Sequence, residues 1–184
     1  MWDVTGVYPD GKWTSRAAAP EEIDRLWADL GSTDGVRAYR ALWRMAAGRQ
    51  SVAFLAPRLG PVPRIAEERV ARLIAELDSD RFEVRDRASK ELEQLGELAG
   101  PALRKALAGK PSLEVRRRLK TLLDQVGGRT LAAEQLRALR AVEVLEHIGT
   151  SDAQEVLKKM AKGAPEARLT REATVALDRL NNKP

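Results

Sequence analysis

The stretch 80-DRFEVRDRASKELEQLGELAGPALRKAL-107 contains two amphipathic segments separated by a glycine. In the first segment, apolar residues recur every three or four positions and charged residues lie between them, which is the pattern of a helix with one buried face. Its predicted buried positions are Phe82, Val84, Ala88, Leu92 and Leu95, and a return helix after Gly96 is expected to bury Ala102, Leu103, Ala106 and Leu107. Ser79 or Asp80 is the expected N-cap. Such a pair still has an open apolar side, so further helix pairs must pack on it.

The composition favours an all-α protein. Of the 184 residues 43% are hydrophobic but only 4% are aromatic, whereas sheets draw on aromatic and β-branched residues. The length suits one domain. No apolar run approaches the roughly 20 residues that a membrane helix needs. Cysteine is absent, which is compatible with a reducing compartment, and a cytoplasmic location is the prediction.

Glycine, proline and capping residues divide the chain. Residues 1–19 are expected to form a non-helical head, residues 20–180 a single helical domain, and residues 181–184 a frayed tail. The run Gly60-Pro61-Val62-Pro63 is the strongest internal break and is interpreted as a hinge. Gly31, Gly48 and Gly149 are predicted to end helices, one of Ser32, Thr33 and Asp34 to cap one, and Ser112 to cap a helix whose apolar residues begin at Leu113.

A repeat of helix-pair length is visible over residues 78–180. Val84-Arg85 and Val115-Arg116 each open a predicted helix after an acidic residue, and they lie 31 residues apart. Over residues 78–180, and more loosely over 32–59, the chain resembles HEAT repeats. That resemblance implies a HEAT/armadillo-like stack of about eight to ten antiparallel helices, an α-solenoid or superhelical bundle.

The head has a different character. Trp2-Asp3 followed by Val4-Thr5-Gly6 resembles the last strand of a WD-repeat blade. With the helical body, it is similar to the helical region that follows a WD-repeat propeller in large bacterial proteins. This resemblance implies an accessory scaffold that binds a protein partner, without chemistry or a cofactor of its own, and that is monomeric or weakly oligomeric.

The residues needed for catalysis or metal binding are scarce. The only histidine is His147, so a Ser-His-acid site would have to include it. Its place in the last turn of a helix, four residues after Glu143, favours a structural role. Without cysteine a zinc site is not expected. Trp27 and Trp43 lie on apolar stripes and are predicted core residues. We therefore expect no enzyme, no metal and no cofactor, with an enzyme acting through His147 as the weakest alternative.

The charge distribution points to an acidic partner. The net charge is +5, and residues 101–120 hold seven cations against Glu114 alone. The predicted partner-binding residues are Arg104, Lys105, Arg116, Arg117 and Lys120. A protein partner is the first interpretation and a nucleic acid the second. No aromatic residue lies between 101 and 120 to stack on a base, and such cations can also simply keep helix faces soluble.

Overall fold

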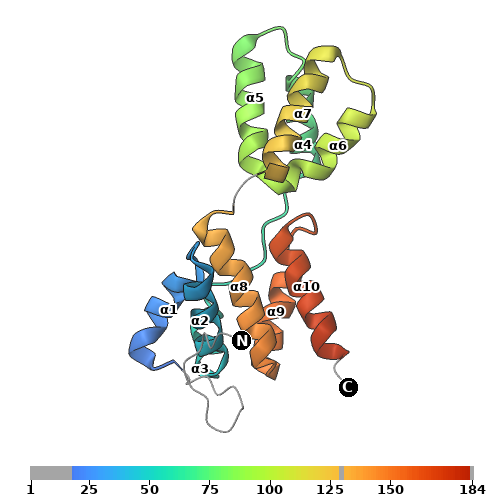
Figure 1. The fold of residues 1–184 in the computed structure, drawn as a ribbon. Helices are drawn as coiled ribbons and strands as arrows, with labels where there is room; N and C mark the ends of the chain where they lie inside the picture. The colour runs from blue at the N-terminus through green and yellow to red at the C-terminus, as the bar shows by residue number, and fades with distance from the viewer. Residues whose placement is uncertain (1–17, 129–130, 183–184) are drawn as a thin grey trace. The chain divides into compact units, whose positions relative to one another are not determined.

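The computed structural model describes residues 18–128 and 131–182, and in these ranges the protein is helical and contains no strand (Figure 1). The predicted all-α class is confirmed. The helices are α1 (Ile23–Leu30), α2 (Gly35–Ala46), α3 (Gln50–Leu55), α4 (Glu67–Glu76), α5 (Phe82–Leu95), α6 (Gly100–Ala108), α7 (Leu113–Gly128), α8 (Ala133–Ile148), α9 (Ser151–Ala161) and α10 (Arg168–Asn181), with short 3-10 helices at Pro20–Glu22 and Gly96–Ala99. None of these helices is long and apolar enough to span a bilayer. The predicted Trp-Asp strand lies outside the described residues.

The helices form two compact units, whereas the sequence analysis expected one domain over 20–180. Unit 1 comprises Met1–Val62, Leu131–Gly163 and Leu169–Pro184, and unit 2 comprises Pro63–Thr130 and Ala164–Arg168. The first border falls inside the predicted break at residues 60–63. Most of unit 2 is therefore inserted between two parts of unit 1 that are distant in sequence.

Helix α8 is the central helix of unit 1. It packs against α1 and α2 on one side and against α9 on the other (Figure 1). Its buried residues Ala141, Val142, Val144 and Leu145 join a core to which α1, α2, α3, α9 and α10 also contribute. Helix α10 is tied to α8 by a bidentate ion pair, in which Arg179 Nε and Nη2 each donate to Glu146 at 2.7 Å. This pairing raises the pKa of Arg179.

Arg140 of α8 completes the C-terminal end of α1. Its Nη1 donates to the carbonyl oxygens of Leu30, at 2.6 Å, and of Ser32, at 2.7 Å. The last carbonyls of a helix have no partner within the helix, so a cation from elsewhere in the fold can satisfy them. Gly31 lies at the same junction, and a Cβ there would come within 2.9 Å of the carbonyl oxygen of Ala133. The end of α1 and the start of α8 are thus in close backbone contact.

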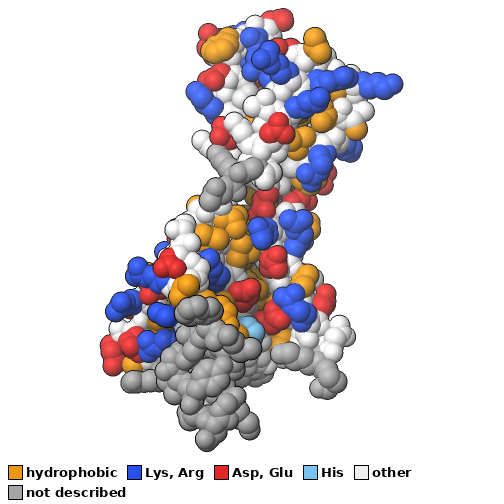
Figure 2. All heavy atoms as spheres, in the orientation of Figure 1, with side chains coloured by type: hydrophobic (Ala, Val, Ile, Leu, Met, Phe, Trp, Pro, Cys, Tyr) orange, Lys and Arg blue, Asp and Glu red, His pale blue; other side chains and the backbone are white. Residues whose placement is uncertain are grey.

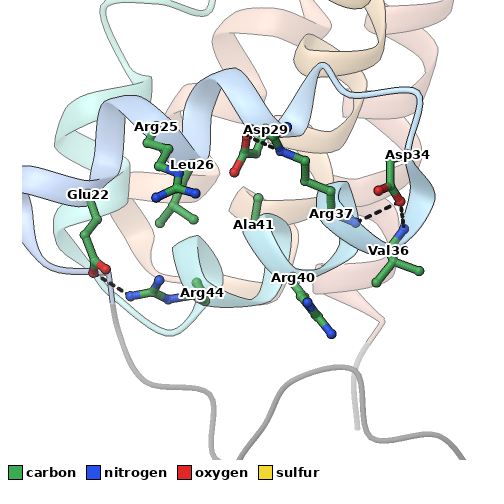
Figure 3. Close-up of a pocket in the computed structure, with 10 residues that line it drawn as sticks. All are labelled: Glu22, Arg25, Leu26, Asp29, Asp34, Val36, Arg37, Arg40, Ala41 and Arg44. Carbon is green, nitrogen blue, oxygen red and sulfur yellow. Dashed lines mark hydrogen bonds and ion pairs between the residues drawn. The ribbon is translucent and has the colours of Figure 1, made fainter.

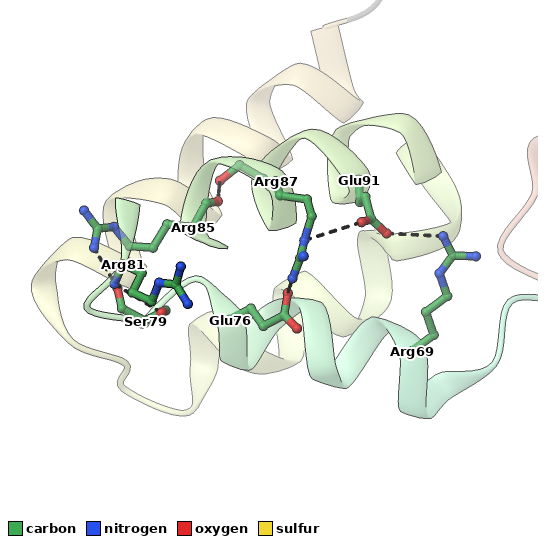
Figure 4. A network of polar contacts seen from close by, with 8 residues as sticks. Arg69, Glu76, Ser79, Arg81, Arg85, Arg87 and Glu91 are labelled. Carbon is green, nitrogen blue, oxygen red and sulfur yellow. Dashed lines mark hydrogen bonds and ion pairs between the residues drawn. The ribbon is translucent and has the colours of Figure 1, made fainter. Parts of the chain in front are cut away.

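Unit 2 has its own core, formed by α4, α5, α6 and α7. Val70, Leu73, Leu77, Ala88, Leu92, Ala99, Leu103, Val115, Leu119 and Leu122 are its buried apolar residues. A chain of ion pairs on the surface joins α4 to α5 (Figure 4). Glu91 contacts Arg69 at 3.3 Å, and Arg87 contacts Glu76 at 3.1 Å and Glu91 at 4.0 Å.

The start of α5 differs from the sequence prediction. Neither Ser79 nor Asp80 caps it: the N-cap is Arg81, and no side chain accepts a hydrogen bond from the first turn. Ser79 instead accepts a hydrogen bond from the Arg81 amide, and its carbonyl accepts one from Arg85. Phe82, predicted to be buried, is 64% exposed. It is the first helical residue, where no neighbouring helix of unit 2 covers it.

Other helix ends follow the prediction. Asp34 caps α2 by accepting hydrogen bonds from the amides of Val36, at 2.9 Å, and Arg37, at 3.3 Å. Gly149 follows α8 with φ +63°, the left-handed conformation in which glycine is favoured. The turn after α6 is different, because the residue with positive φ is Lys110, at +56°, and not Gly109.

Replacing Arg140 with alanine should lower the free energy of unfolding of unit 1 by about 2 kcal/mol, because two carbonyl oxygens lose a charged donor. The measurement is denaturant unfolding, monitored by hydrogen exchange of the α8 amides. Arg171→Ala, which removes an exposed arginine of α10, is the control and should change the value little. Equal losses in the two variants would show that the Arg140 contact contributes nothing.

Lys110→Gly should stabilise unit 2 by about 1 kcal/mol, because glycine adopts a positive φ without steric cost. Lys110→Ala removes the same charge but keeps the cost, and it should give no gain. Hydrogen exchange of the α7 amides reports both values. A gain in the alanine variant as large as in the glycine variant would attribute the effect to charge.

Candidate interaction surface on helices α6 and α7

The five basic residues singled out in the sequence are all exposed and lie on two neighbouring helices of unit 2. Arg104 and Lys105 belong to α6, and Arg116, Arg117 and Lys120 belong to α7, which packs against α6. None of the five makes an ion pair with a described residue. Figure 2 shows Lys and Arg side chains gathered over α6 and the turn that follows it.

Helix α7 has a well-defined outer face. Val115, Leu119 and Leu122 are buried in the core of unit 2. The helical period places Leu113 on the opposite side, together with Arg116, Arg117 and Lys120 at the following positions i+3, i+4 and i+7. Leu113, one of the predicted apolar residues of this helix, is 84% exposed. The exposed apolar side chain of Leu113 therefore lies at the N-terminal end of a row of three cations on α7.

Arg118 does not belong to this row. Its Nη2 contacts Glu114 at 2.6 Å, one turn earlier on the same helix. Consecutive helical residues point about 100° apart, so the run Arg116 to Arg118 divides between an outward face and an ion pair within the helix.

A groove of about 430 Å³ separates α5 from α7 and is bordered by Arg117. Its charged lining residues are three acids, Asp86, Glu93 and Glu114, and three cations, Lys90, Arg117 and Arg118. Asp86 holds Lys90 at 2.8 Å, and this hydrogen bond raises the pKa of Lys90. The groove carries no excess charge, because its three acids balance its three cations. The excess positive charge therefore lies outside the groove, on the outer side of α6 and α7.

His147 is exposed, and its ring stacks on the ring of Trp43 with a centroid separation of 4.4 Å. Tyr39 meets Trp43 edge to face at 6.0 Å. Trp43 and Trp27 are half-buried and pack against the core of unit 1, where the sequence placed them. Among the described residues, no group of three or more His, Cys, Asp or Glu side chains is placed to hold a metal ion.

A second groove, which the sequence analysis missed, lies between α1 and α2 in unit 1 (Figure 3). Four arginines line it: Arg25, Arg37, Arg40 and Arg44. They are spread over 20 residues of a segment whose helices were predicted only from their buried residues. Their common feature, the helical period of the polar positions, is present in the sequence and could have been used to find them.

Leu113→Ser should leave the free energy of unfolding of unit 2 within about 0.5 kcal/mol of the wild-type value, since an exposed side chain contributes little to a core. The matched control is Leu119→Ala on the buried side of the same helix, which should cost about 2–5 kcal/mol. Denaturant unfolding, monitored by hydrogen exchange of the α7 amides, measures the free energy of unfolding of both variants. A large loss in Leu113→Ser would mean that the side chain is needed for folding and is not free to bind.

Comparison with known proteins adds no family to this description. No family model, no curated protein and no solved structure matches the chain.

Proposed function

We propose that the protein is a non-catalytic protein–protein interaction scaffold that binds an acidic protein segment on the outer side of α6 and α7. The observation that carries the proposal is the exposed Leu113 next to Arg116, Arg117 and Lys120, three cations without an ion pair among the described residues. In the proposed complex, the partner buries Leu113 and supplies carboxylates to the three cations.

The energetics of this surface suit a protein partner. Burying a leucine side chain is worth about 1.5–3 kcal/mol, and charge-assisted hydrogen bonds to carboxylates add to that value. The other face of α7 is anchored in the core by Val115 and Leu119, so the row of binding residues is fixed before the partner arrives. A preformed surface loses less conformational entropy on binding.

The architecture supports the same role. We interpret the helix pairs α4–α5 and α6–α7, which pack in sequence within unit 2, as HEAT-like hairpins that act as a rigid support. Val84 and Val115, the residues of the predicted repeat, lie near the starts of α5 and α7, and Val115 is buried. In unit 1, α8 packs on α1 and α2 from about 100 residues earlier, so the proposed repeat stack is limited to unit 2. We expect the chain to act as a monomer or a weak oligomer.

Binding of a nucleic acid to the same cations is the second candidate. Phosphates need only the positive charges, and the affinity would fall steeply with salt. Leu113 would contribute nothing to it, and neither α6 nor α7 has an aromatic side chain for stacking on a base. The two candidates therefore differ in their dependence on Leu113.

The test compares two labelled probes of equal charge: a short peptide of glutamate and leucine, and a single-stranded oligonucleotide. Lys120→Gln should weaken the binding of the peptide, and Leu113→Ser should weaken it by about tenfold, because it removes most of the apolar area that the peptide buries. Fluorescence anisotropy at two salt concentrations measures the affinities.

Arg69→Gln, on α4 and engaged with Glu91, is the control and should leave peptide binding unchanged. Oligonucleotide binding that depends on Lys120 but not on Leu113, without peptide binding, would favour the nucleic-acid candidate. If neither probe binds at low salt, this surface has no role in binding acidic partners.

A further inference from the structure

The groove between α1 and α2 has an apolar floor and charged walls. Leu26 of α1 and Ala41 of α2 form the floor, and both are buried. The groove has a volume of about 470 Å³. Its walls carry four guanidinium groups and three carboxylates, with Glu22 near one end and Asp34 near the other (Figure 3).

The three carboxylates are engaged within the protein. Asp34 accepts the amide hydrogen bonds that cap α2. Asp29, whose side chain is 12% exposed, accepts two contacts from Arg37. Glu22 pairs with Arg44 and also accepts a hydrogen bond from the Ala19 amide at 3.0 Å. The acids thus hold the local structure together and hold two of the arginines in place.

Three of the guanidinium groups, those of Arg25, Arg37 and Arg44, keep donors to spare. A guanidinium has five N–H donors. Arg37 uses Nε, at 2.7 Å, and Nη2, at 2.6 Å, on the same oxygen of Asp29, so its Nη1 stays available. Arg44 is held by Glu22 through Nη2. Arg25, from the opposite wall, makes no hydrogen bond or ion pair with a described residue. Arg37 and Arg44 are held in place by these ion pairs, and all three guanidinium groups can bind a carboxylate in a planar, two-pronged geometry.

The spacing of these groups indicates the form of the ligand. Arg37, Arg40 and Arg44 lie at i, i+3 and i+7 on α2, so they form a row about 10 Å long. We propose that this groove binds an acidic peptide segment whose carboxylates are spaced about one helical turn apart. A continuous polyphosphate backbone fits less well, because Glu22 and Asp34 place negative charge at both ends of the row. This site lies in unit 1 and shares no residue with the surface on α6 and α7.

The test uses a fluorescein-labelled peptide of about 12 residues, long enough for three helical turns, with glutamate at every fourth position and alanine elsewhere. The full chain should bind it, and Arg25→Gln should weaken binding by about tenfold, the loss expected for one charge-assisted pair. Arg25→Lys keeps the charge but loses the two-pronged geometry and should give an intermediate loss. Thermal unfolding checks that the variants are folded.

The double variant Arg116→Gln/Lys120→Gln separates this site from the surface on unit 2. It should change the affinity for this leucine-free peptide by less than about twofold, since it removes no group of the groove. Equal losses from Arg25→Gln and from the double variant would overturn the proposal, because they would show binding by overall charge. Equal affinity for the glutamine version of the peptide, or competition by inorganic phosphate at peptide-like concentrations, would also overturn it.

Discussion

The contact between Arg140 and the end of α1 joins two parts of the chain that are about 110 residues apart. It satisfies carbonyl oxygens that α1 cannot satisfy alone, and it places α8 where its apolar face can meet α1 and α2. Helix α8 packs on both α1 and α2, which also pack on each other. The core of unit 1 therefore depends on closing a loop that contains most of unit 2. Loop-closure entropy grows slowly with length, which explains how a fold can tolerate so large an insertion.

The arginines of this protein divide into two groups. Arg140, Arg85 and Arg87 hold the fold, because each meets a carbonyl or carboxylate of a neighbouring segment. Arg25 and Arg116 have no such acceptor among the described residues. A guanidinium whose donors are all used by structural acceptors has little to gain from a ligand, whereas one with unused donors, such as Arg25 or Arg37, can exchange water for a partner's carboxylate. This difference, and not the net charge of +5, separates candidate binding surfaces from ordinary basic helix faces.

The two proposed surfaces use the same physical arrangement in different units. Each combines cations with an apolar element, an exposed leucine on α7 and the buried floor of the groove in unit 1. In each, the supporting helix is anchored by core residues on its other face. The function proposed for these surfaces is binding by complementarity, which needs no reactive group.

The sequence alone determined the helical class and most helix borders, including the cap at Asp34 and the end at Gly149, because periodicity, capping and turn conformation are properties of neighbouring residues. It also located the five basic residues of α6 and α7. Only the tertiary structure decided that residues 63–130 are inserted into another unit, that Phe82 and Leu113 face solvent, and that four arginines line one groove. Burial at the first position of a helix, and the meeting of side chains from two helices, depend on which segments pack together, and local sequence patterns do not encode those partners.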